Sequence, residues 1–194
     1  MFAVPVSLTQ FIAFCVTALG FFASIALAFW RKSSETGATT SSSSRVGILL
    51  QMVGFAIVGF GVIRVALDPL SPFALLETAT VIALMGGAIA LFVTSSRALG
   101  RNWSLVARTR TDHELIRSGP YARVRHPIYL AMLLFLIALA IGLGHWGQLL
   151  IAVPLFLIGT RIRTNAEDHL LEQSFGDAFR QYRDTTPALL PKIG

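Results

Sequence analysis

The sequence predicts an all-α fold, a polytopic membrane bundle of about five transmembrane helices that ends in a C-terminal amphipathic helix. Of its 194 residues, 54% are hydrophobic and 13% are charged, whereas a soluble domain carries about 25% charged residues. The apolar residues also gather in long runs, and about 20 such residues cross a hydrocarbon core of about 30 Å. We therefore expect one integral membrane domain over residues 1–194, with no separate soluble domain.

Three N-terminal spans are expected within residues 1–96, at the apolar runs 8–29, 46–67 and 74–95. The first run contains no charged side chain, and it exceeds the roughly 7 to 15 residues of a signal-peptide core. We expect it to remain as a membrane anchor. The serine- and threonine-rich tract after it has the composition of a flexible connector.

The fourth apolar run, residues 128–160, is too long for one span and is expected to form a helical hairpin. The stretch "GLGHWG" at 142–147 supplies turn-forming glycines and a His-Trp pair suited to a membrane interface. Each arm then has about 16 residues, or roughly 24 Å of helix, which is short for a full crossing.

The basic residues predict the orientation of the chain. With the N-terminus outside and five crossings, every lysine and arginine except Arg64 lies on the cytoplasmic side, as the positive-inside rule requires. The net charge of +6 is thus explained by topology, and we expect no nucleic-acid partner. Cys15, the single cysteine, excludes disulfides within the chain and a cysteine metal site. No metal site is expected.

Polar residues concentrate in segments 97–127 and 161–194, so function is expected where these two segments meet. The first contains a Gly-Pro turn and then "RHP", which places a proline in the first turn of the fourth helix. Such a helix start exposes backbone N–H groups to an anion, and Tyr121 and Tyr129 offer flat faces to a heterocycle. A basic loop that only touches anionic lipid is the open alternative.

The second segment places Arg163 and Glu167 four residues apart, on one face of a helix. An apolar stripe from Ala166 to Tyr182 predicts that this helix is amphipathic and lies on the inner surface of the bundle. The alternative for Arg163 and Glu167 is an ordinary surface pair, which contributes about 0.3 to 0.5 kcal/mol.

The stretch "SGPYARVRHPIYL", a hairpin, and then "RTNAEDHLLEQSFGDAFRQYRDTTPALLP" together resemble the isoprenylcysteine carboxyl methyltransferase family. The resemblance covers about the C-terminal half of the chain. The expected number of five spans agrees with that of the small prokaryotic members of the family. It implies an integral membrane methyltransferase that uses S-adenosylmethionine without a Rossmann domain. The methyl acceptor would be the carboxylate of a lipid-like or prenylcysteine-type molecule arriving through the bilayer. Residues 97–194 would then form the catalytic part, with the cofactor loop, the hairpin and the C-terminal helix.

Carried over residue by residue, the resemblance implies two sets of site residues. Arg163 would hold the acceptor carboxylate, and Glu167 would fix that arginine or meet the acceptor amide. The residues implied in cofactor binding are His113, Leu115, Gly119, Tyr121, His126, Pro127 and Tyr129. Two positions depart from the family pattern. Ala131 stands where glycine is common, and Asp168 replaces a second glutamate, so its role stays open.

Two other functions remain open at this point. A methyltransferase acting on an amine, such as a phospholipid headgroup, would need Glu167 as proton acceptor. A non-enzymatic bundle could anchor a partner or conduct an ion, but the first three spans show no ionisable residue at mid-membrane. Under each of these functions we expect membrane lipids around the chain and a monomeric protein.

Overall fold

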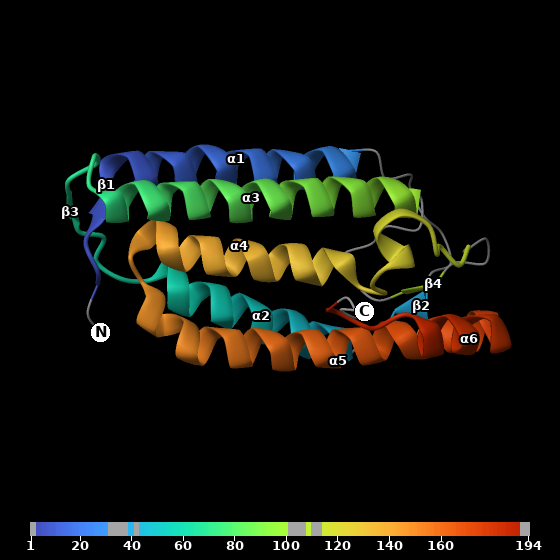
Figure 1. Ribbon diagram of the computed structural model, residues 1–194. Coiled ribbons are helices and arrows are strands. Elements are labelled where there is room, and N and C mark those ends of the chain that lie inside the picture. Colours follow the sequence, from blue (N-terminus) through green and yellow to red (C-terminus); the bar gives the residue numbers. More distant parts are fainter. Residues whose placement is uncertain (1–2, 31–38, 41–42, 101–107, 110–113, 191–194) are drawn as a thin grey trace.

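The computed structural model describes residues 3–30, 39–40, 43–100, 108–109 and 114–190 (Figure 1). These residues form five long helices and one short one, namely α1 (Leu8–Trp30), α2 (Ser43–Gly59), α3 (Pro72–Leu99), α4 (Pro127–Leu143), α5 (Leu149–Phe175) and α6 (Asp177–Thr185). The same described residues include the 3-10 turns η2 (Gly119–Ala122) and η3 (Trp146–Gln148). The expected all-α bundle, with its hairpin and its final amphipathic helix, is confirmed.

Short strands tie the two ends of the bundle. At one end β1 (Val6–Ser7) pairs in parallel with β3 (Val65–Leu67). At the other end β2 (Thr39–Thr40) pairs antiparallel with β4 (Arg108–Thr109).

The long helices lie side by side and alternate in direction along the chain, with α4 between the α1–α3 pair and the α2–α5 pair (Figure 1). Within the described residues, α1, α3 and α5 with its preceding turn are long and apolar enough to cross a membrane. Helices α2 and α4 are apolar but have 17 residues each, or about 26 Å of helix. The chain is therefore an integral membrane protein, and which side each terminus faces stays a prediction.

The second helix is shorter than expected. The apolar pattern predicts helix as far as residue 67, but α2 ends at Gly59 and the chain continues in extended form to β3. The end of α2 is held by the hairpin turn, because His145 Nδ1 lies 2.8 Å from the Val58 carbonyl and Gln148 donates to the Phe60 carbonyl. These side chains satisfy carbonyls that a continuing helix would otherwise use.

The helix of the fifth span is longer than expected. Helix α5 carries the fifth span and the polar segment beyond it without a break, to Phe175. Gly176 then adopts a φ of 53°, a conformation open to glycine and rare for other residues. The apolar stripe predicted for one amphipathic helix is thus divided between α5 and α6.

Helices α2 and α5 touch backbone to backbone at two glycines. A Cβ atom added at Gly47 would lie 2.6 Å from the Gly159 carbonyl oxygen and 2.5 Å from Arg163 Cγ. A Cβ at Gly159 would lie 2.7 Å from the Gly47 carbonyl oxygen. Small residues allow such close packing of membrane helices, and here the packing places Arg163 directly against α2.

Candidate active site

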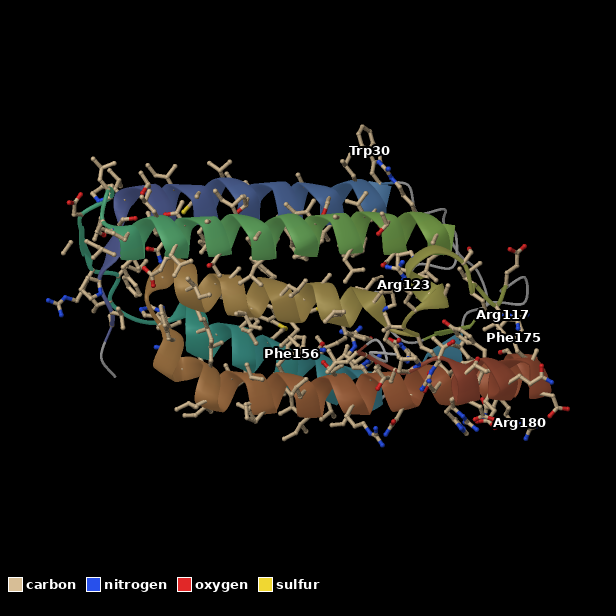
Figure 2. All side chains as sticks on the ribbon, viewed as in Figure 1. Trp30, Arg117, Arg123, Phe156, Phe175 and Arg180 are labelled. Atoms are coloured by element: carbon tan, nitrogen blue, oxygen red, sulfur yellow. The ribbon has the colours of Figure 1, made fainter. Side chains whose placement is uncertain are left out.

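Charged side chains gather at the end of the bundle that carries α6. Figure 2 shows Arg117, Arg123 and Arg180 at this end, whereas Phe156 lies midway along the bundle. The start of α4 is fixed there by Pro127 in its first turn, where the missing N–H of proline costs no hydrogen bond. His126 precedes this proline, and Glu167 and Asp168 of α5 face His126.

His126 lies between two carboxylates. Its Nε2 is 2.9 Å from Asp168 Oδ1, its Nδ1 is 3.2 Å from Glu167 Oε2, and its side chain is 5% exposed. Ionised carboxylates only accept hydrogen bonds, so both ring nitrogens are donors and the imidazole is protonated. Burial lowers the pKa of His126, but the hydrogen bonds to Asp168 and Glu167 outweigh burial and raise the pKa to about 9.

Tyr129 connects this histidine cluster to Arg163. Its hydroxyl donates to Glu167 Oε1, and the guanidinium carbon of Arg163 lies 4.9 Å from the centre of its ring, within the range of a cation–π contact. Arg163 and Glu167, which the family resemblance implied as a catalytic pair, thus both contact Tyr129. Arg163 is 5% exposed. Arg163 and Glu167 therefore do not form the ordinary helix-surface pair that was the alternative to a catalytic pair.

Gln51 of α2 belongs to this site, and no motif in the sequence indicated it. Its Oε1 accepts from Arg163 Nη1 at 2.9 Å, and its Nε2 donates to Thr160 Oγ1 at 2.9 Å. The side chain is 2% exposed. A glutamine inside an apolar span was the available signal, because a buried polar side chain in a membrane needs a partner.

The C-terminal segment closes over the start of α4. The backbone N–H groups of Arg125 and His126 donate to the carbonyls of Pro187 and Ala188, each at 2.9 Å. Arg125 Nη2 also lies 2.9 Å from Asp168 Oδ2, and its Nη1 donates to the carbonyl of Thr186. Asp168, whose role the sequence left open, therefore holds Arg125 and His126 together.

A second link joins the C-terminal segment to η2. The hydroxyl of Tyr182 donates to the Tyr121 carbonyl at 2.6 Å. Burial raises the pKa of Tyr121 well above its usual value and that of Tyr182 to about 12, so both phenols keep their protons at neutral pH. Arg183 also forms an ion pair with Glu172 of α5, with 2.6 Å between Nη1 and Oε2.

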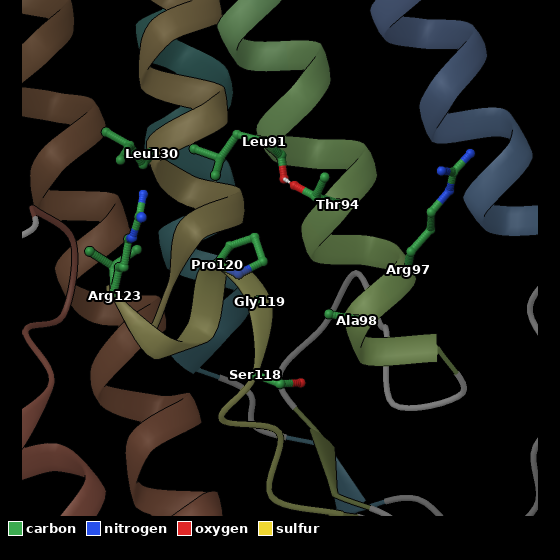
Figure 3. A pocket seen from close by; sticks show the side chains of 10 residues that line it. Leu91, Thr94, Arg97, Ala98, Ser118, Gly119, Pro120, Arg123 and Leu130 are labelled. Atoms are coloured by element: carbon green, nitrogen blue, oxygen red, sulfur yellow. Dashed lines mark hydrogen bonds between the residues drawn. The ribbon is translucent and has the colours of Figure 1, made fainter.

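A separate groove of about 730 Å³ lies on the other side of η2, between α3 and the start of α4 (Figure 3). Apolar side chains such as Leu91 and Leu130 line it, together with Arg97 and Arg123. Gly119, predicted as a cofactor residue, lines this groove. Neither Arg163 nor Glu167 does, so the groove is distinct from the cluster around His126.

The other predicted residues lie as follows. His113 is outside the described residues, and Leu115 is partly buried in the stretch that leads to η2. Tyr121 and Pro127 are buried beside the cluster. Ala131 is fully buried in the hydrophobic core that contains Phe14, Phe21 and Phe135. Among the residues that the structure describes, no group of three His, Cys, Asp or Glu side chains could hold a metal ion.

Fold and site together define an integral membrane helical bundle with a buried, charged site at one end. The family model described as phospholipid methyltransferase matches residues 76–178, more than half of the chain. The chain belongs to this family. The matched region runs from α3 into α6 and includes His126, Tyr129, Arg163 and Glu167, whereas Gln51 lies outside it.

Three curated proteins are similar to about half of this chain. The chain is 34% identical over 97 residues to the protein-S-isoprenylcysteine O-methyltransferase of Schizosaccharomyces pombe, covering 48% of this chain and 41% of that protein. It is 30% identical over 100 residues to the nickel-cobalt-cadmium resistance protein NccN of Alcaligenes xylosoxydans xylosoxydans, covering 49% and 45%. It is 31% identical over 104 residues to the cobalt-zinc-cadmium resistance protein CzcN of Cupriavidus metallidurans, covering 51% and 46%. The matches span less than half the length of each relative.

Proposed function

We propose that this protein transfers a methyl group from S-adenosylmethionine to the carboxylate of a lipid-like acceptor, such as a prenylated cysteine. The observation that carries the proposal is the buried Arg163 guanidinium, which lies over Tyr129 beside the His126–Glu167 cluster. A guanidinium presents donors in a fork that matches a carboxylate. Membership of a methyltransferase family and the 34% identity to an isoprenylcysteine O-methyltransferase support the same reaction.

The residues around His126 fit a cofactor that is a cation with an aromatic base. When bound, S-adenosylmethionine supplies a methyl group on a positively charged sulfur. The carboxylate of Glu167 and the face of Tyr129 both favour a nearby positive charge. Tyr121 and Tyr129 provide aromatic surface at the start of α4. The resemblance also implies His113, Leu115, Gly119 and Pro127 in cofactor binding. Pro127 lies beside His126 at the start of α4, whereas Gly119 lines the separate groove.

The protein's part in the reaction is to orient two reactants and to exclude water. Arg163 would hold the acceptor carboxylate with one oxygen directed at the methyl group, and the closed C-terminal segment would shield the site from solvent. An ionised carboxylate needs no general base to attack a methyl group. Holding two reactants in line can lower the barrier by about 7–11 kcal/mol, which is sufficient for catalysis without proton transfer.

The amine alternative is kept because the family description names a phospholipid methyltransferase. An amine acceptor would lose a proton on methylation, and Glu167 would have to take it. Both Glu167 oxygens already accept hydrogen bonds, from Tyr129 and from His126. Taking up a proton would remove the negative charge of Glu167 that faces His126, so the geometry favours a carboxylate acceptor.

The experiment is methyl transfer by purified protein in lipid vesicles, with labelled S-adenosylmethionine. One arm contains a farnesylated cysteine analogue, and the other contains phosphatidylethanolamine without it. Alkali releases methanol from a methyl ester but leaves an N-methyl group intact. We expect alkali-labile label in the first arm only. Stable label in the ethanolamine lipid would favour the amine reaction, and no transfer in either arm would contradict the proposal.

A further inference from the structure

Gln51 is a buried polar side chain that α2 sends into the site. It lies four residues, or about one helical turn, beyond Gly47, where the backbones of α2 and α5 touch. This contact fixes which residues of the two helices face each other. Gln51 therefore meets Thr160 and Arg163, which follow Gly159 on α5.

The orientation of the Gln51 amide is determined by its two partners. A guanidinium has donors only, so the amide oxygen must face Arg163 and the amide nitrogen must face away from it. The nitrogen then donates to the Thr160 hydroxyl at 2.9 Å, while the oxygen accepts from Arg163 at 2.9 Å. Thr160 is 3% exposed, so water does not compete for this contact.

The chemistry of an amide at position 51 differs from that of the other residues that would fit. A carboxylate there would pair with Arg163 and cancel its charge, and it would compete with an acidic acceptor for the same donors. An apolar side chain would leave a buried guanidinium N–H without its acceptor. Glutamine accepts one hydrogen bond, fixes the direction of the guanidinium and leaves its positive charge in place.

We infer that Gln51 is a positioning residue for the acceptor and makes the site selective for an anionic headgroup. It acts through Arg163, whose plane it holds over the Tyr129 ring, with Thr160 setting the direction of the amide. The inference rests on the proposed methyl transfer to a carboxylate, and it adds α2, which lies outside the residues 76–178 matched by the family model, to the site.

The test compares four variants at positions 51 and 160 and one control variant with the unchanged protein, all reconstituted in vesicles. Gln51→Glu places a negative charge beside the Arg163 guanidinium, and Gln51→Leu removes the hydrogen bond that Arg163 donates to residue 51. Thr160→Val removes the hydroxyl that orients the amide, and Thr160→Ser retains it. Gln10→Leu is the matched control, because Gln10 is also a fully buried glutamine, on α1, and donates to the Ile141 carbonyl at 2.7 Å near the far end of the bundle.

The readouts are KM and kcat for a farnesylated cysteine analogue, the affinity for S-adenosylmethionine, and binding of the acceptor's carboxylate form against its carboxamide form. We expect Gln51→Leu to raise the acceptor KM roughly 10- to 100-fold, the range for losing a hydrogen bond to a charged group. Gln51→Glu should abolish the preference for the carboxylate over the carboxamide. Thr160→Val should shift KM in the same direction as Gln51→Leu. Thr160→Ser, which retains the hydroxyl, should restore the KM lost in Thr160→Val. Gln10→Leu should leave the acceptor KM and the preference for the carboxylate unchanged, and cofactor affinity should stay within about twofold in all variants.

Two kinds of failure are distinguishable. If the unchanged protein transfers no methyl group to a carboxylate, the proposed reaction fails, and preferential binding of the carboxylate form still tests the role of Gln51. If the protein is active but Gln51→Glu keeps its preference for the carboxylate, the inference about Gln51 is wrong. Should both position-51 variants fail to fold, equal KM values for Thr160→Val and Thr160→Ser would overturn it.

Discussion

The protonated His126 predicts that the folded protein loses stability in mildly alkaline solution. The pKa of His126 is raised from 6.5 to about 9 because Asp168 and Glu167 both accept from its ring. The folded state therefore binds a proton that the unfolded state releases above about pH 6.5. This contribution is fully present below pH 6.5 and is lost as the pH rises through about 9.

The size of the effect follows from the shift. One pKa unit corresponds to 1.36 kcal/mol, and the rise from 6.5 to about 9 corresponds to a contribution on the order of 3 kcal/mol. The His126 side chain is 5% exposed, so solvent screens this contribution little. The measurement is the free energy of unfolding in mixed detergent micelles, followed from pH 6 to pH 10.

Two variants make this test specific. His126→Gln should be less stable at pH 6, because Asp168 and Glu167 lose their charged partner, and it should lack most of the decline with pH. His169→Gln should keep the decline, because His169 lies exposed on α5. If the unchanged protein has the same stability at pH 6 and pH 10, or if His126→Gln declines as steeply, the assignment of a protonated His126 is refuted.

Three further predictions concern other parts of the molecule. Tags at the N-terminus and at Gly194 should be reached from opposite sides of the membrane, with Gly194 cytoplasmic, and labelling from one side only would contradict the five-span topology. Tyr129→Ala should weaken S-adenosylmethionine binding in equilibrium dialysis at least tenfold, because it removes an aromatic face and a donor to Glu167; unchanged affinity would place the cofactor elsewhere. Tyr182→Phe should speed amide hydrogen exchange at residues 119–122, because the Tyr121 carbonyl loses its partner, and unchanged exchange would show that this link does not hold the loop.

The number of apolar helices could be predicted from the sequence because a membrane requires long runs of apolar residues. The end of α2 could not, since the residues after Gly59 are as apolar as the helix itself. That end depends on His145 and Gln148, which come from a turn more than 80 residues later. The long α5 was also missed, because a helix that leaves the membrane need not end where its apolar residues end.

The candidate site likewise contains residues that could be predicted from the sequence and one that could not. His126 and Tyr129 lie three residues apart at the start of α4, and Arg163 and Glu167 lie four apart on α5, so each pair could be predicted to share a face. That the two pairs meet was implied by the family resemblance. Gln51 was not predicted, because its partners depend on how α2 packs against α5 at two glycines. Helix packing of this kind is a tertiary property, and no local motif encodes it.

Replacement of Arg163 by lysine is the sharpest test of whether this residue binds the acceptor carboxylate. An exposed helix pair would contribute about 0.3–0.5 kcal/mol and would tolerate lysine, but Arg163 is 5% exposed and contacts both Gln51 and the Tyr129 ring. Lysine keeps the charge and loses the planar fork.

If Arg163 grips a carboxylate, Arg163→Lys should lower methyl transfer to a farnesylated cysteine analogue by one to several orders of magnitude, because misplaced reactants lose the advantage of alignment. S-adenosylmethionine affinity should stay within about twofold, since this arginine serves the acceptor. The melting temperature of the same preparation shows whether the variant is folded. Near-normal transfer by a folded Arg163→Lys would mean that charge alone suffices at this position, and the fork-and-carboxylate geometry would have to be abandoned.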